Sequence, residues 1–338
     1  MRGRHVDSLQ GWIWYERMRY RCHECEKTYF PLDEEMELGK SRMSLQKESQ
    51  LALLSVHMTY ADAKEVYEEL TRNKTGTMTA HRTVQRWASR IVDLESPELP
   101  EVAGKEHVAG DGVMVPLREE GWKEAKVGAH YKVDEDREAQ TIRYTATLGS
   151  REAFGQRLYE LAHQPPLEKT AKMAYVGDAA EWLDGIQQHH FPLAERIVDV
   201  FHAKEYLWDV ANAFYQKGTA QARDWAEGKA QQLLRADQRG LQKSLVHMKP
   251  KNPEQRQALT NARRYFKNHG HHMDYPRYEK MGFHIGSGIA EAACKHVVQS
   301  RFKRSGMRWS RQGAEKLLQL RVAYLNNQWG QVLERQKN

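Results

Sequence analysis

The sequence contains little cysteine and no long apolar run. Three cysteines among 338 residues are too few for a disulfide framework, and no apolar stretch approaches the roughly 20 residues that cross a bilayer. The beginning of the chain, MRGRHVDSLQGW, lacks an apolar core followed by a small-residue cleavage site, so we expect no secretion signal. These absences predict a soluble, cytoplasmic protein with no membrane partner.

Acidic residues are fewer than basic ones. The chain has 52 Lys and Arg against 45 Asp and Glu, a formal charge of +7 and a pI near 9.1. From residue 295 to the C-terminus, ten basic residues stand against two acidic ones. A run of charge is often only the solvated face of a helix. An excess this one-sided nevertheless favours contact with phosphate, and therefore a polyanionic partner.

Two of the cysteines, Cys22 and Cys25, form a CxxC motif. Arginines alternate with other residues over 17–21, which predicts one strand with a basic face running into the motif. A tetrahedral zinc site needs four ligands, but the sequence has no second CxxC, and His5 and His23 are poorly spaced to replace it. The segment is therefore either half a zinc ribbon or two free thiols in a small hairpin.

Residues 45–92 have the pattern of three helices. Thr59 would cap the second helix, and Thr79 would cap the third, which begins at Ala80. Long hydrogen-bond donors on the exposed face of the third helix are typical of a helix-turn-helix that reads a major groove. The alternative is an ordinary helical hairpin with a solvated face. The predicted DNA-binding side chains of this helix are Arg82, Gln85 and Arg86.

The segment SPELPEVAG at 96–104 is typical of a linker. After it, strand and helix patterns predict the order β-β-β-α-β-α-β-α. Three meandering strands followed by alternating elements indicate a mixed sheet with helices on its faces. Residues 203–270 have a helical pattern throughout, which predicts an inserted all-α block. A late helix follows, with Glu291 near its start.

Three carboxylates stand out by their positions in this predicted α/β fold. Asp111 lies on the first strand, Asp178 at the end of the fourth and Glu291 on the late helix. Ligands collect beyond strand ends in open α/β sheets, and adjacent central strands would place the two aspartates side by side there. Two carboxylates about 4 Å apart repel by roughly 4 kcal/mol at an effective dielectric near 20. Oxygen ligands without Cys or His suit Mg²⁺ or Mn²⁺; for Asp178 alone, a helix cap is the alternative.

Several motifs carry a resemblance to a known family: HVAGDGVMV, YVGDAAEW, IVDVFHAKEYLW, GSGIAEAACKHVVQSRFKRSGMRWS and GAEKLLQLR. Over nearly its whole length the chain resembles the transposases of ISKra-type bacterial insertion sequences, DDE transposases of the Mutator-like group. The resemblance implies a ribonuclease H-like domain with an all-α insertion, whose triad falls on Asp111, Asp178 and Glu291. The Asp-x-x-His motif of the family falls on Asp199 and His202. Similar transposases usually carry a second CxxC ahead of the first, so the zinc ribbon here looks truncated.

The function that the resemblance implies is that of a DNA transposase. It would bind terminal inverted repeats and target DNA as a homo-oligomer, and two Mg²⁺ (or Mn²⁺) ions on the triad would serve phosphodiester hydrolysis and strand transfer. A catalytically inactive, truncated transposase acting as a DNA-binding repressor is the alternative, and a structure-selective nuclease is a third. The implied domains are the CxxC hairpin (1–40), the helix-turn-helix (41–95), the catalytic domain (105–204 and 281–338) and its helical insertion (205–280).

Further residues support or compete with this assignment. Asp199 also ends a strand, so it competes with Asp178 as the second metal ligand. His202 would either orient a phosphate or be a satisfied structural histidine. Lys295, one turn after the glutamate, would contact phosphate, and Trp309 would either stack on an unpaired base or be a buried anchor. The predicted DNA-binding residues of the basic tail are Arg301, Lys303, Arg304 and Arg308.

Overall fold

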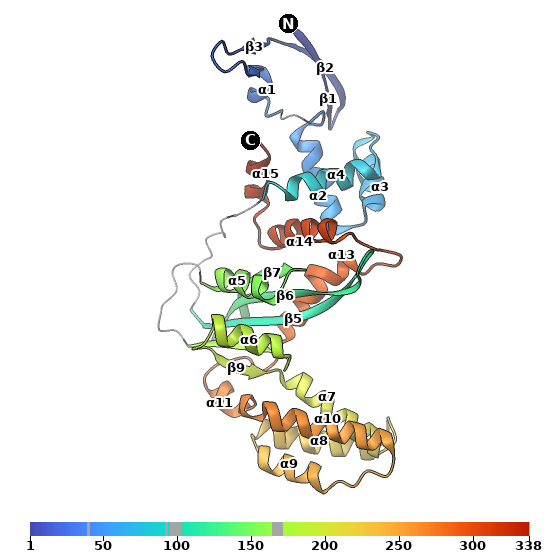
Figure 1. The fold of residues 1–338 in the computed structure, drawn as a ribbon, viewed down its shortest axis with the longest axis vertical. Coiled ribbons are helices and arrows are strands. Elements are labelled where there is room, and N and C mark those ends of the chain that lie inside the picture. The colour runs from blue at the N-terminus through green and yellow to red at the C-terminus, as the bar shows by residue number, and fades with distance from the viewer. Residues whose placement is uncertain (39–40, 92–93, 95–102, 164–171, 338) are drawn as a thin grey trace.

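The structure, a computed structural model, describes residues 1–38, 41–91, 94, 103–163 and 172–337. The predicted linker at 96–104 falls largely on residues 95–102, which lie outside this part of the chain. The described elements follow one long axis (Figure 1). Two small hairpins lie at one end, a sheet lies in the middle, and a block of helices lies at the other end.

The N-terminal region contains two antiparallel hairpins and a short helix. The first hairpin pairs β1 (Arg2–Ser8) with β2 (Gly11–Arg17), the second pairs β3 (Tyr20–Arg21) with β4 (Thr28–Tyr29), and α1 (Pro31–Glu35) follows. The prediction of a single strand with a basic face over 17–21 is wrong. The strand ends at Arg17, whose guanidinium forms an ion pair with Asp33 and lies 3.6 Å above the ring of Phe30.

Three helices follow as predicted: α2 (Leu45–His57), α3 (Tyr60–Thr71) and α4 (Thr77–Ala88). The hydroxyl of Thr59 caps α3 by accepting from the Asp62 amide at 3.0 Å. The predicted start of the third helix is wrong, because α4 begins at Thr77 with Gly76 as its N-cap. The Gly76 carbonyl already accepts from the Thr79 amide at 2.9 Å, so Thr79 lies inside the helix and does not cap it.

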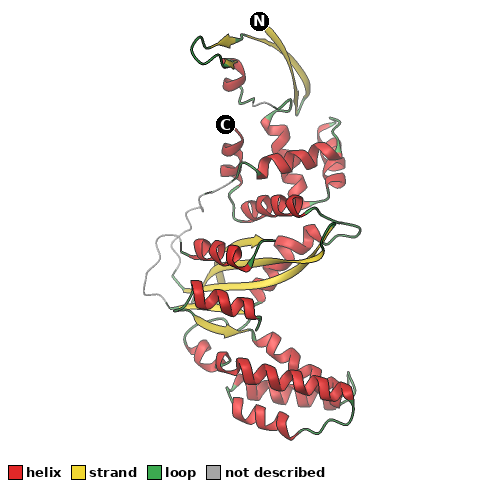
Figure 2. Ribbon diagram, in the orientation of Figure 1, coloured by secondary structure: helices red, strands yellow, loops and turns green. Residues whose placement is uncertain are grey.

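A five-stranded mixed sheet forms the centre of the molecule, as predicted (Figure 2). Its order is β7-β6-β5-β8-β9, in which β5, β6 and β7 are antiparallel and β8 and β9 run parallel to β5. The strands are β5 (Lys105–Leu117), β6 (Gly121–Val133), β7 (Ala139–Thr147), β8 (Met173–Gly177) and β9 (Glu195–Val198). Helices α5 (Arg151–Ala162) and α6 (Glu181–His190) separate the later strands.

Three paired glycines allow α5 and α6 to pack close to the sheet. Gly110 of β5 is paired with Gly128 of β6 and with Gly177 of β8. A Cβ atom on Gly110 or Gly177 would lie 2.8 or 2.9 Å from the side chain of Leu183 on α6. Because successive residues of a strand point to opposite faces, the residues after Gly110 and Gly177 point to the sheet face opposite α6.

The predicted all-α block follows β9. Its helices are α7 (Val200–Phe214), α8 (Ala220–Leu234), α9 (Gln238–His247), α10 (Pro253–His269) and α11 (Tyr275–Lys280), with the 3₁₀ turn η1 (Gly270–His272) before α11. The late helix consists of α12 (Gly288–Ala293), the π-helical segment η2 (Cys294–Gln299) and α13 (Ser300–Phe302). The chain ends with α14 (Arg311–Leu325) and α15 (Trp329–Lys337). No helix among the described residues is both long and apolar enough to span a membrane.

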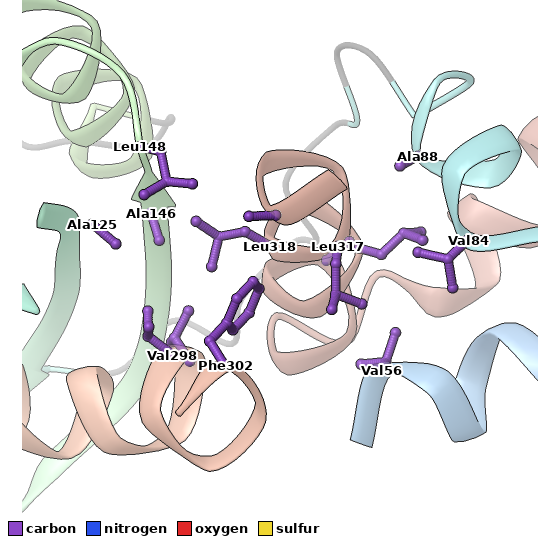
Figure 3. Packing of buried hydrophobic residues seen from close by; sticks show 14 of the residues in the cluster. Val56, Val84, Ala88, Ala125, Ala146, Leu148, Val298, Phe302, Leu317 and Leu318 are labelled. Atoms are coloured by element: carbon purple, nitrogen blue, oxygen red, sulfur yellow. The ribbon is translucent and has the colours of Figure 1, made fainter. Parts of the chain in front are cut away.

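One apolar cluster joins the C-terminal helices to both the sheet and the three-helix unit (Figure 3). Leu317 and Leu318 of α14 lie at its centre. Val56 and Val84 approach from the three-helix unit, and Leu148 approaches from the end of β7. The last part of the chain therefore packs against the three-helix unit as well as against the sheet.

His107 on β5 is fully buried and is fixed by two hydrogen bonds. Its Nδ1 lies 2.8 Å from the Lys105 carbonyl oxygen, and its Nε2 accepts from the His284 amide at 3.0 Å. A proton on Nε2 would break the second bond. Burial is the main cause that lowers the pKa of His107 from 6.5 to about 4.

We expect the free energy of unfolding to fall as the pH drops from about 6.5 towards 4. In this window the unfolded chain binds a proton at residue 107 that the folded chain excludes, so stability present at pH 7 is lost. The loss from this residue is roughly 2 kcal/mol by pH 5. Urea unfolding at pH 7 and pH 5 should show a smaller loss for His107→Gln than for the native protein. Equal losses would contradict this role of His107.

Candidate active site

Asp111 lies in the middle of β5 and points away from α6. One carboxylate oxygen, Oδ1, accepts from the Gly112 amide at 2.6 Å, and Oδ2 accepts from the Cys294 thiol at 3.4 Å. Burial raises the pKa of Asp111, and the negative charges of Asp178 and Glu291 raise it further. The structure thus places Asp111 close enough to the other two predicted carboxylates for their charges to act on it.

Asp178 follows β8 next to the strand of Asp111. The paired residues Gly110 and Gly177 lie on adjacent strands, which are about 5 Å apart. The carboxylate of Asp178 accepts from the Ala180 amide at 3.0 Å, but the N-cap of α6 is Ala180 itself, which makes no side-chain cap. Capping of α6 is therefore not the role of Asp178.

Arg196 of β9 fixes the backbone that carries Asp178. Its buried guanidinium donates to the carbonyl oxygens of Gly177 (3.3 Å) and Asp178. On the other side, Nε donates to the carboxylate of Asp184 on α6 at 2.8 Å. The guanidinium of Arg196, which Asp184 of α6 fixes in turn, therefore holds the backbone at the end of β8 and at Asp178.

Glu291 reaches the same region from α12, which packs against β5 and β6. Its side chain is exposed. Glu291 precedes Cys294 by three residues, so the two side chains share one face of the helix, and the Cys294 thiol reaches Asp111. Burial raises the pKa of the Cys294 thiol, and the charges of Asp111 and Glu291 add to this effect. Cys294 is therefore a neutral donor to Asp111.

The three predicted carboxylates thus lie on one face of the sheet, where β8 ends beside the middle of β5. They are not arranged as a ready-made metal site: across the described residues, no group of three His, Cys, Asp or Glu side chains has the geometry to hold a metal ion. The donor set itself suits a hard cation, because all three groups are carboxylates. A cation would also relieve the repulsion that raises the pKa of Asp111.

Asp199 directly follows β9, and its carboxylate is occupied by hydrogen bonds within the protein. It is 2% exposed, and its carboxylate accepts from the Phe201 amide (2.8 Å), where it caps α7, and from the Ser287 hydroxyl. The neighbouring Val200 amide donates to the Ile285 carbonyl oxygen at 3.0 Å. Asp199 therefore connects the sheet to the turn before α12, whereas the carboxylate of Asp178 has fewer internal partners.

His202 and Lys295 lie at the edges of this region. His202 on α7 pairs with Glu205 (3.0 Å), and its ring lies edge-on to Tyr206 and Tyr265. Burial raises the pKa of Tyr265, and the charges of nearby groups, Asp178 included, contribute. These rings border the site on the side of the helical block. Lys295 is exposed on the π-helical segment, one turn after Glu291.

Trp309 is an internal anchor. It is 8% exposed, its Nε1 donates to the Phe302 carbonyl oxygen at 3.1 Å, and its ring lies 4.9 Å from that of Phe302. Its backbone pairs with the end of β5, where the Trp309 amide donates to Pro116 at 3.1 Å. Of the two predicted roles, the structure agrees with the buried anchor, since the ring has no free face for a base.

Arg301 is also internal, which corrects its prediction as a DNA contact. The side chain has no solvent exposure, Nε donates to the Ser55 carbonyl oxygen at 2.8 Å, and the guanidinium lies 5.0 Å from the rings of Tyr60 and Trp309. A side chain in this position cannot reach a phosphate. The other predicted basic residues of this segment, Lys303, Arg304 and Arg308, are exposed.

The predicted reading face of α4 is partly occupied. Arg82 is exposed. Arg86 forms an ion pair with Glu48 of α2 at 2.7 Å, and Gln85 lies 3.4 Å from the Gly313 carbonyl oxygen of α14. Because α14 covers part of this face, Arg82 is the most accessible of the three predicted side chains.

Cys22 and Cys25 lie in the turn of the β3–β4 hairpin. The Cys22 amide donates to the Lys27 carbonyl oxygen at 2.9 Å, and Glu26 has a left-handed backbone (φ 56°). Hydrogen bonds from the amides of Cys25 and Glu24 and from the Cys25 thiol lower the pKa of Cys22. Both thiols are free, and the lowered pKa makes Cys22 easier to ionise than an ordinary thiol, which is the change that metal ligation requires.

Sequence reasoning missed Cys294 and Arg196 as parts of this site. A signal for the two aspartates was present, because each follows a glycine after an apolar run, in AGDG and in VGDA; β8 ends at its glycine, whereas β5 continues beyond Asp111. No sequence pattern indicated the contacts of Cys294 and Arg196, since both depend on which elements pack together.

The fold and the site define a mixed α/β protein whose central strands carry acidic residues on one face, with an all-α block next to them. The chain belongs to UPF0236, described as an uncharacterised protein family, whose profile matches residues 1–338. It is similar to a protein of Streptococcus gallolyticus, the "UPF0236 protein in vanSb 3'region". The two are 25% identical over 342 residues, which cover 96% of this chain and 73% of the relative.

Proposed function

We propose that this protein is a DNA transposase of an insertion sequence, with a ribonuclease H-like catalytic domain and the triad Asp111, Asp178 and Glu291. The observation that carries the proposal is the position of the carboxylates: Asp111 and Asp178 each follow one of the paired glycines Gly110 and Gly177, and the charges of Asp178 and Glu291 act on Asp111. The strand order supports it: three antiparallel strands are followed by two strands parallel to the first. The motifs that resemble ISKra-type transposases contain all three carboxylates.

The residues of the chain have distinct tasks in this proposal. The triad would hold Mg²⁺, which when bound supplies charge neutralisation at the scissile phosphodiester and activates the attacking oxygen. Arg196 and Asp184 keep the backbone of Asp178 in place, and the Cys294 thiol keeps Asp111 oriented. The exposed Lys295 would bind a non-reacting phosphate.

The three-helix unit and the exposed basic residues would bind DNA in the same proposal. Arg82 on α4 is accessible for a groove or phosphate contact, and Lys303, Arg304 and Arg308 are exposed beyond α13. Arg304 already lies 3.3 Å from Asp62 of α3, so this basic segment is next to the three-helix unit. DNA bound by that unit would therefore also meet the basic segment.

A strand-transfer assay with the DNA that flanks the gene tests the proposal. We expect cleavage at the element end with Mg²⁺, followed by joining of the freed 3′-hydroxyl to a target duplex. Products that are only nicked would contradict transposition and favour a nuclease. Binding without any cleavage would also contradict it and favour a DNA-binding repressor.

A further inference from the structure

The β5–β6 hairpin extends well beyond the carboxylates. Its pairing with β8 ends at Gly110 and Gly177, but β5 continues from Asp111 to Leu117, which is roughly 20 Å at the rise of a strand. The late helix covers roughly 17 Å from Glu291 to its end at Phe302, at the rise of a helix. The second half of β5 and the late helix therefore extend from the carboxylates over a similar distance. Both end near the bridge between Leu117 and Trp309.

The hairpin tip and the loop after α13 are joined at that place. Leu117 and Trp309 form a parallel bridge, and the Arg118 amide donates to the Trp309 carbonyl oxygen at 2.8 Å. The guanidinium of Arg118 donates to the Arg308 carbonyl oxygen at 3.2 Å. Trp122, next to the turn, is 60% exposed, and the ammonium of Lys303 lies 5.9 Å from its ring.

Positive charge gathers around this junction. Arg118, Lys303 and Arg308 are exposed, and so is Arg82 of α4. Arg82 is near the junction, because the ring of its neighbour His81 lies 5.2 Å from that of Tyr60, which lies 6.3 Å from that of Trp309. Burial lowers the pKa of His81, and the charges of Arg118 and Arg82 lower it further. The nearby Glu120 is neutralised by two bonds of 2.7 Å from Arg311. We call Arg82, Arg118, Trp122, Lys303 and Arg308 the hairpin surface.

We propose that the hairpin surface binds the backbone of a DNA duplex that continues along α12–α13 to the carboxylates. This inference rests on the proposed function, and it adds Arg118 and Trp122, which lie outside the predicted DNA contacts. A duplex has one base pair per 3.4 Å of its axis, so the contacts at the hairpin surface lie about six base pairs from the scissile phosphate. Lys295 is exposed between the two ends of this path.

The salt dependence of DNA binding tests the surface without relying on cleavage. The probe is a 30-base-pair duplex of mixed sequence, and its dissociation constant is measured by fluorescence anisotropy at several salt concentrations. Each lost phosphate contact lowers the slope of log affinity against log salt by about 0.9. We expect a slope reduced by about 2 for the double variant Arg118→Ala/Lys303→Ala.

A matched control removes the same charges elsewhere. Arg239 and Lys251 are exposed in the helical block, and Arg239→Ala/Lys251→Ala should leave the slope unchanged. Trp122→Ala should weaken binding by up to about fivefold, because the ring holds the Lys303 ammonium at 5.9 Å, and it should leave the slope unchanged, because a neutral ring releases no counterion. A slope that is equal in the native protein and in Arg118→Ala/Lys303→Ala would overturn the inference, and would leave an acidic protein as the partner of this surface.

The outcomes separate this inference from the proposed function. A native chain that cleaves DNA and joins it to a target, but whose double variant keeps the native salt slope, is a transposase without this surface. If the native chain never cleaves DNA but the double variant has a reduced salt slope, the protein has this surface without the proposed activity. The melting temperature of each variant is also measured, and a value equal to that of the native protein shows that the fold is intact.

Discussion

Asp111→Asn should bind element-end DNA as tightly as the native protein and cleave it at least roughly 10³-fold more slowly. The variant keeps the size of the side chain and its bond from the Gly112 amide, but it removes one of the three negative charges that would hold the cation. Loss of a residue that acts only as part of such a unit removes most of the catalysis of the whole unit. The measurement is single-turnover cleavage with Mg²⁺, with DNA binding recorded on the same samples.

The stability of Asp111→Asn distinguishes a catalytic role from a structural one. The charges of Asp178 and Glu291 disfavour the ionised form of Asp111, so the neutral amide should leave the melting temperature unchanged or raise it. Asp224→Asn on the exposed surface of α8 is the matched control and should cleave at the native rate. Native cleavage by Asp111→Asn, or a large loss of stability, would contradict the assignment.

Trp309→Ala should lower the free energy of unfolding by about 3–5 kcal/mol, the range for large aromatic residues truncated in a core. The ring is 8% exposed and packs on Phe302 and on the guanidinium of Arg301. Its removal would leave a cavity where α13, the end of β5 and the three-helix unit meet. Urea unfolding at pH 7 measures the loss.

Trp309→Phe is the control for this second prediction. It keeps most of the apolar volume but loses the Nε1 bond to Phe302, so the loss should be about 1–2 kcal/mol. Should Trp309→Ala instead keep native stability and only weaken DNA binding, the indole would be a base-stacking group and the anchor assignment would be wrong.

Several features of the site could be predicted from local sequence. Asp111 and Asp178 each follow a glycine after an apolar run, and pairing of β5 with β8 through these glycines brings them together. The sheet and the helical block follow from periodicity. The two aspartates could be placed because their positions depend on strand pairing, which local pattern strongly constrains.

The burial of Arg301 could have been predicted from the sequence. It follows Val297 by four residues and Val298 by three, so helical periodicity already puts it on the apolar face. Its charge favours a surface position, but in the structure it is buried, where it contacts the Ser55 carbonyl oxygen and the ring of Tyr60. Lys303, two residues later, is exposed.

Other features could not be predicted because they depend on contacts between distant segments. Arg196 lies in a short strand, and nothing in ERIV indicates that its guanidinium holds the backbone of Asp178. Gln85 and Arg86 have the spacing of a reading face, but α14, more than 220 positions later, covers part of it. The bridge between Leu117 at the hairpin tip and Trp309 after α13 could not be predicted for the same reason.

Binding of Mn²⁺ tests the central claim most directly, because that claim is that Asp111, Asp178 and Glu291 act as one cation-binding centre. Free Mn²⁺ is followed by electron paramagnetic resonance in a titration of the protein bound to element-end DNA. Asp111→Asn, Asp178→Asn and Glu291→Gln should each weaken Mn²⁺ binding by about tenfold or more, whereas Asp224→Asn should not. Native Mn²⁺ affinity in all three variants would contradict the account.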